Sequence, residues 1–178
     1  MNKNAGFTLI EVLIAMLVLA VGLLGLAGLQ AISLKNNQSA YNRSQAIQLA
    51  YDLADRIRAN SSSDTTGLTN IASYTAILPS AATAKSNCLT TVGCLQPDMA
   101  ENDLFEWNNA VITVLPGGVG TINSVQASPI VTITITITWD DNRDGNIDGN
   151  DPNFQTSFQC QNPPIIPPTI PPTSKLYC

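Results

Sequence analysis

The chain has 178 residues and a net charge of −5, which leaves room for a long helix and one small domain and argues against nucleic acid as a partner. It contains no histidine, so the commonest general base and zinc ligand are both missing, and no catalytic constellation is visible. Four cysteines, an even number, among few charged residues are typical of an exported domain with two disulfides. We therefore expect an exported protein that is not an enzyme.

The segment Phe7–Leu29 is almost entirely apolar and is long enough to cross a bilayer as a helix, which takes about 20 residues. It carries one carboxylate, Glu11, although a charge inside a membrane costs about 2.5–3.5 kcal/mol on insertion scales. The small residues Ala5-Gly6 precede the apolar run, whereas in a secretory signal peptide they follow it. We expect residues 1–6 to be a leader and residues 7–29 a transmembrane segment; an uncleaved signal anchor is the alternative.

The run Gly6-Phe7-Thr8-Leu9-Ile10-Glu11-Val12 resembles the class III signal of type IV pilins and type II secretion pseudopilins. The resemblance implies that a prepilin peptidase cuts between Gly6 and Phe7 on the cytoplasmic side and N-methylates Phe7. Glu11 is then the fifth residue of the mature chain, the family's assembly glutamate. In a filament of staggered helices this carboxylate can pair with the N-terminal amine of a neighbour, which offsets the cost of its burial.

We expect the helix to continue to about Asn60, so that residues 7–60 form one element and residues 61–178 a globular domain. Ile47, Ala50, Ala54 and Ile57 recur at three- and four-residue spacings and predict an apolar stripe that packs on a sheet. On the same helix, Asp52 and Arg56 are spaced for an i, i+4 ion pair.

The region after this helix is weakly patterned. Residues 74–78 fit a short helix or a strand. Cys88 and Cys94 enclose five residues, which favours a local disulfide.

A second helix is predicted from Asp98, as an N-cap paired with Glu101, to about Val114. Its apolar face comprises Leu104, Trp107, Val111 and Val114, and a strand over residues 110–115 is the alternative.

Three strands are expected in the remaining sequence. Residues 121–126 and 153–160 fit strands, but the clearest is residues 131–139, where Val, Ile and Trp alternate with Thr. The alternation puts every Thr on one face and the apolar residues on the other. Because such a strand would invite aggregation at an exposed edge, we place it in the centre of the sheet. The fold class is α+β, a pilin fold with a long N-terminal helix on an antiparallel sheet of three or four strands.

The twelve residues 140–151 predict a calcium site. Asp140, Asn142, Asp144 and Asp148 occupy positions one, three, five and nine of an EF-hand-like or dockerin-like loop, and Gly145 occupies the turn. Position twelve departs from the EF-hand pattern, since Asp replaces the usual Glu. The alternative is a solvated hairpin turn, since Asp-Gly is a turn signal. The predicted ligands are Asp140, Asn142, Asp144, Asn146 (through its backbone carbonyl), Asp148 and Asp151.

The C-terminal residues contain three Pro-Pro pairs and end in a cysteine. Such a segment favours a stiff, polyproline-like arm, with a disordered tail as the alternative. A disulfide between Cys160 and Cys178 would tie the arm back, although four cysteines allow three connectivities.

Beyond the N-terminus, the run from Cys94 to Asp141, with Trp107 and a Leu-Pro-Gly-Gly turn, resembles the PilV branch of minor pilins. That resemblance implies a minor subunit near the pilus tip, which primes assembly with other minor pilins, joins the major pilin and supports a tip adhesin. It also implies a stay in the inner membrane before export into the pilus. The alternatives are a minor pseudopilin of a type II secretion system and a single-pass, calcium-binding periplasmic module.

Overall fold

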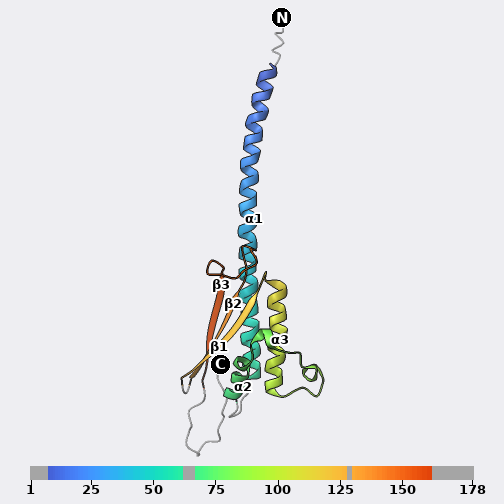
Figure 1. The fold of residues 1–178 in the computed structure, drawn as a ribbon, viewed down its shortest axis with the longest axis vertical. Helices are drawn as coiled ribbons and strands as arrows, with labels where there is room; N and C mark the ends of the chain where they lie inside the picture. Colours follow the sequence, from blue (N-terminus) through green and yellow to red (C-terminus); the bar gives the residue numbers. More distant parts are fainter. Residues whose placement is uncertain (1–7, 62–66, 128–129, 162–178) are drawn as a thin grey trace, which may run out of the picture. The chain divides into compact units, whose positions relative to one another are not determined.

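The computed structural model describes residues 8–61, 67–127 and 130–161 (Figure 1). Helices come first and strands last, which confirms the predicted α+β fold with its long N-terminal helix. The elements in chain order are α1 (Leu9–Asn60), α2 (Gly67–Ala76), the 3-10 helices η1 (Pro79–Ala81) and η2 (Ser86–Leu89), α3 (Gln96–Val114), β1 (Val119–Ala127), β2 (Ile130–Thr138) and β3 (Asn153–Gln161).

The three strands form one antiparallel sheet in the order β1-β2-β3, so β2 is central as its alternation predicts. Val131, Ile133, Ile135 and Ile137 of β2 are buried on one face, whereas Ile130 and the threonines lie on the other face. Ile135, for example, pairs with Ile122 of β1 and with Thr156 of β3. None of the residues of the three strands carries a charge.

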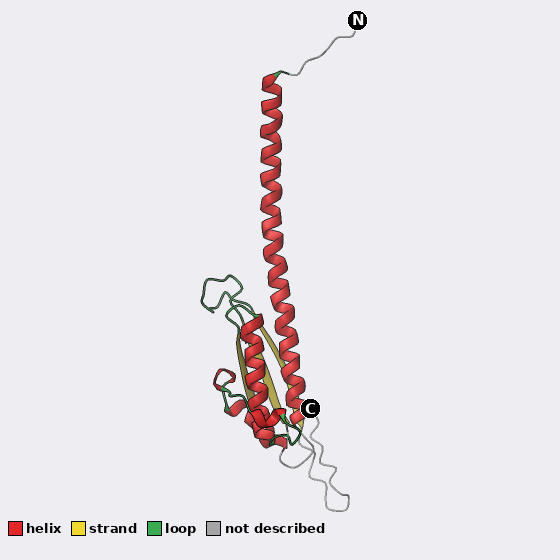
Figure 2. Ribbon diagram, turned by 90° about the vertical axis from the view of Figure 1, so that its right-hand side faces the viewer, coloured by secondary structure: helices red, strands yellow, loops and turns green. Residues whose placement is uncertain are grey.

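The core lies between the apolar face of the sheet and the helices. Of the stripe predicted on α1, Ala50, Ala54 and Ile57 are buried, whereas Ile47 is only half-buried. Ala46 and Leu53 complete the buried face of the helix. Figures 1 and 2 show α3 running beside this part of α1 along the sheet. The alanines of α1 and the buried branched side chains of β2 belong to one hydrophobic cluster.

Trp107 joins α3 to both of its neighbours in the core. Its ring is buried, and its Nε1 donates a hydrogen bond of 2.8 Å to the backbone carbonyl of Leu49 on α1. The other side of the ring lies so close to Gly120 of β1 that a Cβ at that position would overlap it. A glycine is therefore needed at position 120 for steric reasons.

Two predictions about α3, and the alternative for its last residues, are wrong. The helix begins at Gln96 after Leu95, without a side-chain cap, because a proline in its first turn has the φ that starts a helix. Asp98 therefore lies inside the first turn and is not the N-cap. Val114 is 38% exposed, and the next residue, Leu115, is buried in its place. The strand alternative for residues 110–115 is also wrong, since α3 continues to Val114.

The ambiguous segment after α1 forms a helix over most of its length. α2 ends at Ala76, and its Tyr74 is buried against the core.

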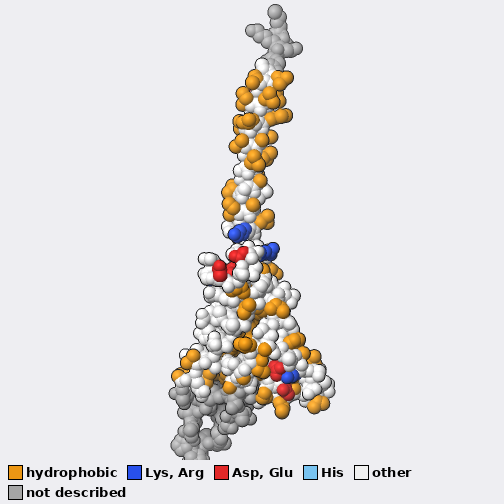
Figure 3. Space-filling view, in the orientation of Figure 1, with side chains coloured by type: hydrophobic (Ala, Val, Ile, Leu, Met, Phe, Trp, Pro, Cys, Tyr) orange, Lys and Arg blue, Asp and Glu red, His pale blue; other side chains and the backbone are white. Residues whose placement is uncertain are grey.

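The structure divides into two compact units, Met1–Tyr41 and Asn42–Cys178, which we describe separately. In the described part of the first unit, the apolar side chains of α1 are exposed, and Figure 3 shows them around the helix on the visible face. Helix α1 is long and apolar enough to cross a membrane, by length and composition.

We expect the substitution Gly120→Ala to lower the free energy of unfolding by about 1–3 kcal/mol, because the added methyl group overpacks the Trp107 ring. The matched control is Gly149→Ala, at which a Cβ would meet no atom within 4 Å. Urea denaturation of the detergent-solubilised chain, followed by tryptophan fluorescence, measures both. Equal stability of the two variants would contradict the steric role of Gly120.

Candidate functional site

Glu11 lies in the first turn of α1 and is exposed, and it is the one charged side chain between Leu9 and Leu34. Its backbone N–H donates to the carbonyl of Thr8, so the carboxylate sits at the positive end of the helix dipole. The side chain is therefore free to meet a partner beyond its own chain. The predicted processing residues, Gly6 and Phe7, lie outside the described residues.

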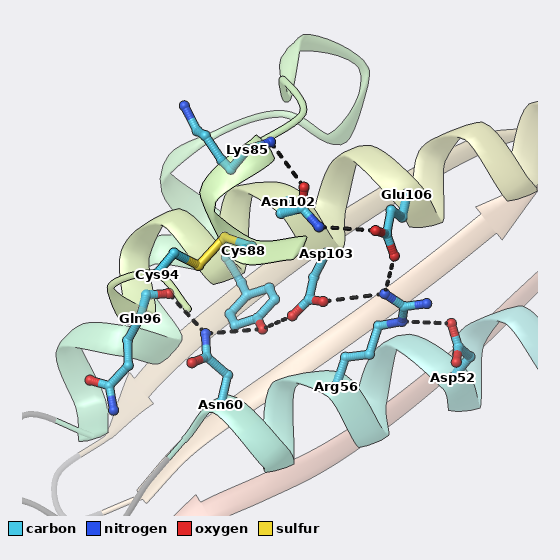
Figure 4. A network of polar contacts seen from close by, with 11 residues as sticks. Asp52, Arg56, Asn60, Lys85, Cys88, Cys94, Gln96, Asn102, Asp103 and Glu106 are labelled. Atoms are coloured by element: carbon cyan, nitrogen blue, oxygen red, sulfur yellow. Dashed lines mark hydrogen bonds and ion pairs between the residues drawn. A yellow bond between two sulfur atoms is a disulfide. The ribbon is translucent and has the colours of Figure 1, made fainter. Parts of the chain in front are cut away.

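Within the second unit, Arg56 connects α1 to α3. Its guanidinium donates to Asp52 at 3.0 Å, which confirms the predicted ion pair, and also to Asp103 at 3.2 Å and Glu106 at 2.9 Å (Figure 4). Burial disfavours the charged form of Arg56, but its hydrogen bond to Glu106 and the nearby carboxylates outweigh this and raise its pKa. The same hydrogen bond lowers the pKa of Glu106. Arg56 and Glu106 are therefore both charged at neutral pH.

The network reaches α2 through Asp103. The hydroxyl of Tyr74 donates to Asp103 at 2.5 Å and accepts from the side-chain amide of Asn60 at 3.2 Å. Burial and the hydrogen bond to Asp103 both raise the pKa of Tyr74, so its hydroxyl keeps its proton and stays a donor. Through these hydrogen bonds the network holds α1, α2 and α3 together.

A second branch of the network holds the loop before α3. Asn102 is buried; it accepts from the backbone N–H of Lys85 at 2.9 Å and donates to Glu106 at 3.0 Å (Figure 4). The ammonium of Lys85 pairs with Glu101 at 2.8 Å. Glu101, predicted as part of a capping box, instead anchors this loop.

The loop contains the predicted disulfide between Cys88 and Cys94, with a Cα–Cα distance of 4.7 Å. Gly93 precedes the second cysteine with a positive φ of 75°, a conformation that glycine adopts without strain. Cys160 is buried at the end of β3, and its predicted partner Cys178 lies outside the described residues.

The acidic loop 140–151 is folded by its own carboxylates. Asp140 is 6% exposed and accepts hydrogen bonds from the backbone N–H groups of Arg143, Asp144 and Gly145. Asp151, at the other end, accepts from the N–H groups of residues 141 and 148. Gly145 has a φ of 89°, in keeping with the sharp turn predicted there.

The other predicted ligands are exposed, and three of them also bind backbone amides: Asn142, Asp144 and Asp148 accept from the N–H groups of residues 144, 146 and 150. Across the residues that the structure describes, no three acidic or cysteine side chains converge to hold a metal ion. The loop thus brings the predicted ligands into one segment but not around one point, and calcium binding stays a prediction.

One acidic residue of this region has a role that the sequence does not indicate. Asp141 accepts from the side-chain amide of Asn42 on α1 at 3.1 Å and from Trp139 Nε1 at 3.2 Å. These bonds attach the acidic loop to the end of the domain at which α1 enters it. No spacing rule could find the first contact, because its partners are far apart in the sequence.

Two family models match the chain. A model described as the prokaryotic N-terminal methylation motif matches residues 1–27, and one described as Type IV pilin Tt1218 matches residues 28–105. The adjoining matches include Glu11, the disulfide loop and the first part of α3, whereas the sheet and the acidic loop lie beyond them. Comparisons with curated proteins and with solved structures found no match.

We expect Arg56→Ala to lower the free energy of unfolding by about 1–3 kcal/mol, because it leaves Asp103 and Glu106 without their cationic partner. The control is Arg43→Ala, an exposed arginine of the same helix, which we expect to change stability by less than about 0.5 kcal/mol. Urea denaturation of the two purified variants tests this; an equal effect would show that the network does not stabilise the fold.

Proposed function

Because the chain belongs to the type IV pilin superfamily, we propose that it is a minor pilin that sits at or near the tip of a type IV pilus and helps to prime its assembly with other minor pilins. Proteins of this family are structural subunits and not enzymes, in agreement with the expectation from the sequence. The methylation motif and the apolar part of α1 make it an inner-membrane-anchored pilin that is later incorporated into the filament.

The observation that carries the proposal is the position of Glu11. An isolated carboxylate in an apolar segment is costly in lipid and persists where it has a function. Cleavage after Gly6 would create a positively charged amine at Phe7, one helical turn before Glu11 in each subunit. In a bundle of axially staggered helices, the carboxylate of one subunit can pair with the amine of the next, which rewards assembly.

A minor role is supported by features of the globular part of the chain. Trp107, the turn at residues 116–118 and the cysteine pairs resemble the PilV branch and favour a pilus over a secretion pseudopilus. A minor pseudopilin of a type II secretion system shares the same N-terminus and is the alternative within the family. The alternative from a different functional class is a membrane-anchored, calcium-binding periplasmic module that is not a filament subunit.

The test is the composition of sheared, purified filaments from cells that produce the chain. We expect the chain at far lower amounts than the main subunit, with methylated Phe7 as its first residue. We expect Glu11→Ala to reduce incorporation by about tenfold or more, equivalent to the loss of about 1.4 kcal/mol in assembly. The control, Ile14→Ala on the same apolar helix, should enter filaments normally, and both variants should reach wild-type levels in the membrane.

Three outcomes would contradict this proposal. An unprocessed Met1 would exclude the pilin pathway, and abundance equal to the main subunit would exclude a minor role. Deletion of the chain that abolishes protein secretion but leaves pilus number unchanged would favour the pseudopilin.

Calcium binding by residues 140–151 is a separate proposal. It is supported by the ligand spacing and by five aspartates in twelve residues, which repel one another without a cation. The exposed side chains of Asn142, Asp144 and Asp148 can turn toward an ion without unfolding the loop. The role of the ion would be structural, joining the ends of β2 and β3 outside the cell.

We expect isothermal titration of the detergent-solubilised chain to give a calcium Kd of about 10⁻⁴–10⁻³ M, the range of extracellular calcium modules. The double variant Asp144→Asn/Asp148→Asn should weaken binding at least about tenfold. Asp55→Asn, which alters an exposed carboxylate of α1, should leave it unchanged. The absence of calcium-dependent heat at millimolar metal would exclude the site.

A further inference from the structure

The disulfide loop, residues 86–95, exposes three large apolar side chains. Leu89 is 76% exposed, Val92 is 94% exposed and Leu95 is 76% exposed. The disulfide holds them near one another, because Leu89 and Leu95 directly follow the two bonded cysteines. No residue of this loop carries a charge. In Figure 3 the corresponding part of the surface carries separate apolar side chains beside acidic and basic groups. Exposed apolar side chains that a disulfide holds near one another are typical of a protein–protein contact.

The loop is fixed in place, so the exposure of these side chains is a property of the folded domain. The disulfide closes it, and the 3-10 helix η2 forms its first half. Asn102 of α3 holds the base of the loop by accepting from the backbone N–H of Lys85 (Figure 4). Glu101 of α3 pairs with the ammonium of the same lysine. Glu106 in turn connects Asn102 to Arg56 on α1. A surface that is already ordered loses little conformational entropy when it binds, which favours affinity.

The loop and the acidic loop lie at opposite ends of the domain. The side chain of Asn60, the last residue of α1, donates to the backbone carbonyl of Gln96, directly after the disulfide loop. Asn42, where α1 enters the domain, donates to Asp141 of the acidic loop. At 1.5 Å per residue, these two positions on α1 are about 27 Å apart.

These two ends do not complement each other. A second copy of the chain stacked end to end would press Leu89, Val92 and Leu95 against the exposed carboxylates of Asp144 and Asp148. Such a contact would remove water from the carboxylates without supplying a partner, which is unfavourable. The partner that fits the disulfide loop therefore presents an uncharged, apolar surface, and the acidic end of this chain does not.

We propose that the disulfide loop is the docking surface for a pilin subunit of different sequence that stacks on this domain at the end where α1 terminates. The inference rests on the proposed function, in which this subunit joins pilin subunits of different sequence in one filament. It identifies the partner as heterologous, and it explains how a subunit can enter the filament without forming runs of its own.

The first test is photo-crosslinking in cells that assemble filaments, with a photoreactive amino acid in place of Val92 in the full chain. We expect a covalent adduct that mass spectrometry identifies as another pilin with a methylated N-terminal segment. The control carries the same group in place of Val125, which is 66% exposed on β1, and should not give this adduct. An adduct between two copies of the chain, an adduct with lipid, or no adduct would each overturn the proposal.

The second test removes the apolar surface without adding charge. The triple variant Leu89→Ser/Val92→Ser/Leu95→Ser should enter sheared filaments about tenfold less than the wild type, the size expected for loss of the main anchors of an interface. Val125→Ser should enter normally, and urea denaturation should give both variants wild-type stability. If the wild-type chain never enters filaments, the proposed function fails; if wild type and triple variant enter equally, only the docking surface fails.

Discussion

The contact between the alanine stripe of α1 and the isoleucine face of β2 is the constraint on which the rest of the domain depends. Ala46, Ala50 and Ala54 are buried in one cluster with the apolar residues of β2. The same cluster holds Trp107 of α3, which donates to the Leu49 carbonyl and lies against Gly120 of β1. Helix α1 is therefore part of the hydrophobic core of the domain.

The charged side chains of the domain lie outside its three strands. The acidic side chains serve as acceptors at the margins of the domain. Where the helices meet, Asp103 accepts hydrogen bonds from Arg56 and Tyr74, and Glu106 accepts one from Arg56. In the loop beyond β2, Asp140 accepts from three backbone N–H groups. Carboxylates in such positions align separate segments through directional bonds, whereas burial supplies the driving force for folding.

The sequence predicted the elements that have a strong period. The three- and four-residue spacing of the stripe on α1 and the strict alternation of β2 are both confirmed, and together they determine the α+β fold. At α3 the sequence contains two signals for a helix start, a proline and an aspartate. The helix begins at the proline signal, with Gln96 as its first residue. The partners of Arg56 on α3 could not be predicted, because they become neighbours only after the helices pack. Glu11 could be predicted as a candidate site residue from the sequence alone, because a single carboxylate in an apolar run is recognisable without knowledge of the fold.

The composition of β2 has a consequence for how the subunit must fold. Its residues Ile130–Thr138 are β-branched, uncharged and free of proline and glycine, which is the signature of a segment that stacks into cross-β fibrils. In the folded domain both of its edges are paired and its apolar face is covered by α1. Because α1 precedes β2 in the chain, the buried face of α1 is synthesised before the strand that packs against it. The helix that anchors the subunit is thereby also the element that keeps its most aggregation-prone strand from meeting another copy.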